Sequence, residues 1–126
     1  MRLTNEIRVA NGLQVFSAPS SALARAAAIR GTEQVEFYSH TRPDGRSCFT
    51  VLDDCGVART SAGENIAMGT ADAFTPAQIV NMWMDSEGHR KNILNPAFTA
   101  MGVGYGRDDP DEANQYEYFV QLFIGS

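Results

Sequence analysis

The chain has 126 residues, of which 44% are hydrophobic and 20% are charged, and its net charge is −5. This length predicts a single domain over residues 1–126 that is large enough to bury a core. The negative charge excludes phosphate-driven nucleic-acid binding, and no apolar run is long enough to span a membrane. We expect a monomer.

The first predicted element is a helix over residues 2–12. Leu3, Ile7 and Ala10 recur at helical spacing, and Gly12 is a natural stop. The same stretch lacks the basic and apolar segments of a secretory signal peptide. Taken alone, this beginning fits either a cytosolic protein or one whose signal peptide has been removed.

A second helix is predicted from Ser20 or Ser21, whose hydroxyls can cap it, to about Val35. A stripe of small and apolar residues follows the cap: Ala22, Leu23, Ala26, Ala27 and Ile29. Small side chains let a helix pack closely against its neighbour, so we expect this stripe to face the core.

A turn, a short helix and a loop are predicted next. Pro43, Asp44 and Gly45 favour a chain reversal just after His40. A short apolar helix that ends at Gly56 is indicated by Phe49, Val51 and Leu52. Residues 57–63 are expected to form a loop.

Two cysteines flank the short helix. If residues 48–54 are helical they span roughly 10 Å at 1.5 Å per residue, whereas a disulfide needs Cα atoms within about 7 Å. Two buried thiols are therefore favoured over a disulfide between Cys48 and Cys55. A catalytic pair of Cys48 with His40 is favoured least, because no sequence feature orients a base toward the sulfur.

The clearest helix signal begins at Thr75. Thr75 is an N-cap, Pro76 takes the first helical position and Gln78 completes a capping box. One face is predicted to carry Ile79, Met82, Trp83 and Ser86, with Trp83 as a packing residue. Gly88 is expected to end this helix, which places His89 just past its end, in a connector that runs to Pro96.

The C-terminal region predicts an antiparallel hairpin. Residues 100–106 alternate glycine with larger residues, and residues 116–124 are rich in aromatic and β-branched residues. The loop between them carries four acidic residues, Asp108, Asp109, Asp111 and Glu112, without the spacing of an EF-hand. We interpret it as a solvated loop.

Three short motifs follow one another along the chain. His40 opens the turn at 40–45, Gly-Glu-Asn-Ile-Ala occupies 63–67, and Trp-x-x-Ser-x-Gly-His-Arg-x-Asn-Ile-Leu occupies 83–94. Their order and spacing resemble the CAP superfamily, also called SCP-like extracellular or pathogenesis-related-1-like proteins, in its bacterial branch. The resemblance runs from Leu3 to Phe123.

The resemblance implies an α+β fold, an α-β-α sandwich in which a small antiparallel sheet is flanked by helices. It also implies an extracellular or cell-envelope location and a cleft lined by two histidines and two acidic residues. His40, Glu64 and His89 match three of these four positions. Ser86 stands at the fourth, which is usually acidic, and its neighbours Asp85 and Glu87 point elsewhere on a helix.

These residues are the candidate site. Two neutral imidazoles and a carboxylate could hold zinc or another divalent cation, with His40 and His89 as metal ligands, although no cofactor is required. The candidate ligand-binding residues are His40, Glu64, Asn65, Ser86 and His89. Structural roles stay open beside these: His40 could bond a backbone carbonyl, and Glu64 and Asn65 could hold nearby backbone.

Three functions compete. The first is a secreted CAP module whose cleft binds a ligand or a divalent metal; the small molecule, lipid or peptide concerned is not specified by sequence. The second is a protease-like, metal- or His/Glu-assisted hydrolase with Glu64 as general base and catalytic roles for His40 and His89. Against it, the chain has no nucleophile motif and no His-Glu-x-x-His helix. The third is an extracellular interaction or lipid-binding module.

Overall fold

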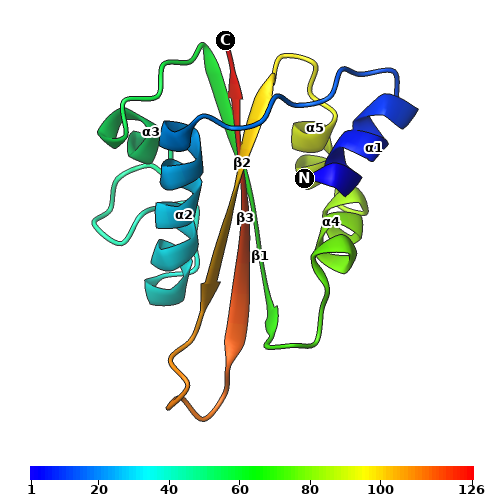
Figure 1. Ribbon diagram of the computed structural model, residues 1–126. Coiled ribbons are helices and arrows are strands. Elements are labelled where there is room, and N and C mark those ends of the chain that lie inside the picture. The colour runs from blue at the N-terminus through cyan, green and yellow to red at the C-terminus, as the bar shows by residue number, and fades with distance from the viewer.

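A three-stranded antiparallel sheet lies between two layers of helices in the computed structural model, which describes all 126 residues (Figure 1). The strands β1 (Ser61–Thr70), β2 (Ala100–Arg107) and β3 (Tyr116–Gly125) are arranged in the order β1-β3-β2. On one face lie α2 (Ser21–Glu36) and α3 (Thr50–Asp54). On the other face lie α1 (Arg2–Ala10), α4 (Pro76–Met84) and α5 (Glu87–Ile93). The predicted α-β-α sandwich is confirmed.

Each face of the sheet carries its own hydrophobic core, because successive side chains of a strand point to opposite faces. Phe123 of β3 packs toward α1 and α4 with Phe16, Ile79, Trp83, Ile93, Phe98 and Met101. Its neighbour Leu122 packs toward α2 and α3 with Leu23, Ala26, Ala27, Val51, Leu52 and Val57. The packing role predicted for Trp83 is confirmed. The hairpin is confirmed as well, since β2 pairs with β3 along its full length.

The small residues of α2 allow this helix to lie directly on β2. A Cβ added at Gly31 would come within 2.5 Å of the backbone nitrogen of Tyr105, and one added at Gly102 within 3.0 Å of the Ala27 side chain. Glycine is used where another backbone approaches closely. The alternating glycines of β2 and the small-residue stripe of α2 are therefore two halves of one contact.

The prediction of a loop over residues 57–63 was partly wrong, because β1 begins at Ser61 and carries Glu64 and Asn65 in its buried middle. Two glycines in this segment, Gly63 and Gly69, have low strand propensity, so the sequence did not show a strand pattern. Glu64 is thus held by the sheet rather than by a loop.

The helix predicted to run from Thr75 to Gly88 is two helices. The capping box at Thr75 is present, but α4 ends at Met84, and Ser86 has extended backbone that starts α5. Gly88 lacks the positive φ of a helix-ending glycine, and His89 lies inside α5 rather than past a helix end. Met82, predicted on the buried face, is exposed.

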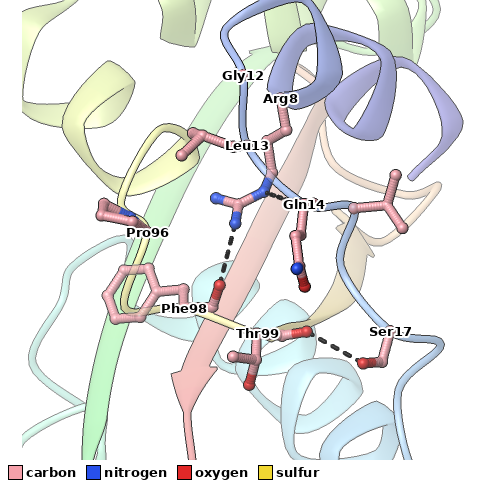
Figure 2. A pocket seen from close by; sticks show the side chains of 9 residues that line it. Arg8, Gly12, Leu13, Gln14, Ser17, Pro96, Phe98 and Thr99 are labelled. Carbon is pink, nitrogen blue, oxygen red and sulfur yellow. Dashed lines mark hydrogen bonds between the residues drawn. The ribbon is translucent and has the colours of Figure 1, made fainter.

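Arg8 fastens α1 to the segment that follows α5. Its guanidinium donates hydrogen bonds to the backbone carbonyls of Gln14, Ile93, Asn95 and Phe98 and lies 3.9 Å from the centre of the Phe16 ring. Figure 2 shows this side chain beside a pocket of about 270 Å³. No carboxylate lies within ion-pair distance of it, and burial lowers its pKa.

Both cysteines are free thiols, as favoured from the sequence, although only Cys48 is buried and Cys55 is half-buried. None of the five helices combines the length and apolar character required to cross a bilayer.

Candidate functional site

A buried ion pair between α2 and β1 is the base of the candidate site. Arg30 Nε lies 2.7 Å from Glu64 Oε2, and Arg30 Nη2 lies 3.1 Å from Glu64 Oε1. The two side chains are 0% and 1% exposed. The guanidinium thus holds the carboxylate through two parallel hydrogen bonds, which fix its orientation as well as its charge.

His40 sits on the outer side of this carboxylate. Its Nδ1 lies 2.9 Å from Glu64 Oε1, and its side chain is 55% exposed. The turn that carries His40 is held by α2, because Gln34 exchanges two hydrogen bonds with the backbone of Ser39 and Arg30 donates a third to the Ser39 carbonyl. Glu64 therefore orients the imidazole through Nδ1, while Nε2 makes no hydrogen bond within the protein.

Glu64 is ionised despite its burial. Burial by itself raises the pKa of this carboxyl, but the hydrogen bonds and charges of His40 and Arg30 outweigh it and hold the pKa below its ordinary value. A carboxylate of this kind attracts the Nδ1 proton of His40. It is a weak general base, because its own protonation is disfavoured.

A pocket of about 480 Å³ opens beside His40 and Glu64. Its remaining lining residues come from the turn and α3 region, from β1 and from α5: Thr41, Ser47, Cys48, Phe49, Ala62, Gly63 and Asn92. The Cys48 sulfur and ligand atoms of His40 and Glu64 lie within 4.8 Å of one another. Burial and the Glu64 charge raise the pKa of the Cys48 thiol to about 12, so the sulfur stays protonated at neutral pH.

His89 reaches the neighbourhood of this cluster without lining its pocket. It is partly buried on α5, and its backbone carbonyl accepts a hydrogen bond of 3.1 Å from the Asn65 side chain. Burial, and to a smaller extent the charge of His40, lower the pKa of His89. The charge of His40 therefore reaches the His89 imidazole.

Asn65 ties the elements around the site together. Its amide nitrogen donates to the His89 carbonyl and to Gln121 Oε1, and its oxygen accepts from Asn92. The side chain is completely buried. All of its polar atoms already have protein partners, so the structure favours the positioning role left open for Asn65 over contact with a ligand.

Ser86 also stands apart from the pocket. It is the N-cap position of α5, makes no capping hydrogen bond and is not among the residues that line the cavity. Of the five predicted ligand-binding residues, the structure places His40 and Glu64 together in the pocket wall and His89 on α5, outside the pocket lining. Whether any of them binds a ligand stays a prediction.

One residue of the site, Arg30, was missed from the sequence, and Cys48 was considered only as the least favoured catalytic partner of His40. Arg30 follows Ala26 and Ala27 at helical spacing, so a charged residue on the buried stripe of a helix was the available signal. Cys48 had no local signal, because its neighbours in the cluster come from other parts of the chain.

The family model of the cysteine-rich secretory protein family, CAP, matches residues 1–123 of this chain. Among curated relatives, the Bacillus subtilis (strain 168) protein YkwD is 39% identical over 99% of this chain and 45% of its own length. The Bacillus subtilis (strain 168) membrane protein YlbC is 34% identical over 97% of this chain and 32% of its own length. The chain thus spans less than half of the curated relatives that it matches.

Solved structures agree with this match. An extracellular protein containing an SCP domain from Bacillus anthracis str. Ames has a TM-score of 0.80 and 30% identity, covering 98% of this chain and 38% of its own. An outer surface protein from Borrelia burgdorferi has a TM-score of 0.77 at 19% identity, covering 98% of this chain and 87% of its own, and supports the fold alone.

Proposed function

Because this chain belongs to the cysteine-rich secretory protein family (CAP), we propose that it is a secreted, monomeric module whose pocket binds a ligand or a divalent metal. His40 is the central residue of that pocket, and His89 on the neighbouring α5 is the second imidazole of the proposed site. The 30% identical Bacillus anthracis protein, described as extracellular, supports the location.

One observation carries the proposal: Glu64 Oε1 lies 2.9 Å from His40 Nδ1. A histidine that binds a metal usually donates its other ring N–H to a carboxylate, which fixes the tautomer and raises the basicity of the free nitrogen. Glu64 occupies that supporting position, since Arg30 already holds both of its oxygens. Nε2 of the exposed His40 side chain is therefore the atom offered to a ligand.

The donor set fits zinc or a similar cation bound weakly. An imidazole nitrogen and a sulfur suit zinc, and His40 and Cys48 lie in one compact group beside Glu64. The Cys48 thiol has to lose its proton to bind, which weakens the site. The carboxylate, however, is already paired with Arg30, and Ser86 supplies no further charge. A hydrolase finds less support, because the low pKa of Glu64 makes it a weak base and the Cys48 thiol stays protonated.

Calorimetry with zinc tests the proposal on the parent, His40→Ala and His89→Ala proteins, with Asp111→Ala in the acidic loop as the matched control. We expect weak binding that His40→Ala abolishes, His89→Ala weakens and Asp111→Ala leaves unchanged. Affinity should fall as the pH drops through about 6.5, because protons compete for the imidazole nitrogens. Equal binding by both histidine variants, with a loss in Asp111→Ala, would move the metal to the loop and refute the proposal.

A further inference from the structure

One edge of β1 has no partner strand. β1 pairs with β3 on one side only, and the sheet ends there. In an antiparallel ladder, the backbone groups of alternate residues point to the partner strand and the others point away. The register assigns Gly63 and Asn65 to the β3 side, while Ala62, Glu64, Ile66 and Met68 present their N–H and C=O groups to the open edge.

Side chains close part of this edge. Asn92 Nδ2 donates to the Glu64 carbonyl at 3.3 Å, and the Trp83 ring nitrogen donates to the Ile66 carbonyl at 3.0 Å. These contacts confirm the direction of the carbonyls and occupy them. Natural proteins cover strand edges in such ways because an open edge pairs with other chains.

The edge stays open where the pocket lies. The N–H and the C=O of Ala62 have no hydrogen-bond partner in the chain, and the Glu64 N–H has none either. Ala62, Gly63 and Glu64 line the pocket of about 480 Å³, with His40 and Cys48 on one side and Asn92 on the other. Unpaired strand groups therefore form a wall of the cavity that contains the exposed imidazole.

We propose that the ligand of this pocket is a polypeptide segment in extended conformation, which adds to the β1 edge beside His40. One residue of the segment exchanges two backbone hydrogen bonds with Ala62, and a second accepts from the Glu64 N–H. Strand addition of this kind derives affinity from the backbone and specificity from neighbouring side-chain pockets. Asn92 and Trp83 limit the added strand to a few residues, so the site accepts a short segment.

This inference rests on the proposed function, because it names the ligand of the same pocket. Its test uses the protein immobilised on resin and a library of random hexapeptides, acetylated, amidated and free of Cys and Pro. The captured peptides are quantified by mass spectrometry. Ala62→Pro removes the N–H donor at a position where that donor is not used by the sheet, which edge strands tolerate. Met68→Pro is the matched control, since Met68 lies on the same edge outside the pocket.

We expect Ala62→Pro to lower capture by about tenfold, the equivalent of roughly 1.4 kcal/mol, and Met68→Pro to leave it within about twofold on the same scale. Thermal melts check that both variants fold. If Ala62→Pro does not fold, hydrogen exchange of the parent decides: captured peptide should slow exchange of the Ala62 and Glu64 amides, and its backbone N-methylated form should not.

Equal capture by the parent and Ala62→Pro, or no added protection at Ala62 and Glu64, would overturn the inference. Zinc calorimetry on Ala62→Pro separates the two proposals. Unchanged zinc binding with unchanged peptide capture would leave the metal proposal standing and remove strand addition. Peptide capture that depends on Ala62, in a protein that binds no zinc, would support strand addition and remove the metal proposal.

Discussion

Arg30 and Arg8 are almost completely buried, at 0% and 2% exposure, on opposite faces of the sheet, yet only Arg30 lies against carboxylates. Arg30 holds Glu64 and Glu33, whereas Arg8 is surrounded by backbone carbonyls and the Phe16 ring. Burial lowers the pKa of both guanidinium groups. At Arg30 the hydrogen bonds of the two carboxylates more than reverse this effect, and at Arg8 nothing does.

This difference shows two uses of a buried cation. At Arg8 the donors satisfy carbonyls that would otherwise lose water without a partner, so the residue joins α1 to the segment after α5. At Arg30 the charge keeps a carboxylate ionised inside the protein, and that carboxylate orients His40. The first use is structural, while the second prepares a side chain that reaches solvent.

The largest effect is expected from Arg30→Met. It leaves the Glu64 carboxylate buried without its main countercharge, and breaking a buried pair on one side costs about 3–5 kcal/mol. Urea denaturation of parent and variant measures the loss. The double variant Arg30→Met with Glu64→Leu should recover much of it, since no buried charge remains. A loss below about 1 kcal/mol for the single variant would mean that the pair is not buried as described.

A smaller loss is expected from Arg8→Met, because no opposite charge is left behind. The carbonyls of Ile93 and Phe98 lose their donor, and at the low end of the usual cost for neutral groups, about 1 kcal/mol for each unsatisfied acceptor, the loss is about 2 kcal/mol. Arg2→Met on the same helix is the matched control: its side chain is 94% exposed, so we expect a change within about 0.5 kcal/mol. If urea denaturation gives Arg8→Met the larger loss of the two buried arginines, the comparison fails.

At the two buried arginines, only the Arg30 side should contribute to the pH dependence of stability, because only Arg30 is paired with a buried carboxylate. The folded-state pKa of Glu64 is below its ordinary value, so its ionisation stabilises the fold fully above that ordinary value. This contribution is lost as the pH falls through the lowered pKa. Glu64→Gln should therefore flatten the acid side of a stability–pH curve. Glu6→Gln, at an exposed position, serves as control and should retain the shape of the parent curve. Arg8→Met should retain the same shape, displaced by a constant loss in the free energy of unfolding.

The smallest effect concerns His89 on α5, whose pKa responds to His40 across the site. Burial and the charge of His40 hold its pKa below the ordinary value, so neutral His89 contributes stability above about pH 6.5 that is lost as the pH falls through the lowered pKa. NMR titration of the His89 imidazole, in the parent and in His40→Ala, measures its pKa directly. We expect His40→Ala to move the pKa of His89 partway toward its ordinary value. No movement would mean that the imidazoles are too far apart to interact.

Local signals predicted the helices that carry their own caps and the strands that carry their own pattern. Ser20 caps α2 and Thr75 begins α4 with a complete capping box, because these hydroxyls satisfy backbone donors within the next few residues. The hairpin of β2 and β3 was visible for the same reason, since alternation lies within each strand. The order of the short motifs identified His40, Glu64 and His89 as candidates.

Tertiary structure decided what depends on residues distant in the chain. β1 is a strand because β3 pairs with it, although Gly63 and Gly69 weaken its own preference. Arg30 is tolerated on a buried helix face only because Glu64 meets it, 34 residues later. Cys48 joins the pocket, and Asn65 is taken up by the hydrogen bonds of α5 and β3, for equally non-local reasons. A local pattern records the hydrogen bonds and packing of neighbouring residues, whereas the charge pairs, the open strand edge and the orientation of His40 exist only once the sheet has formed.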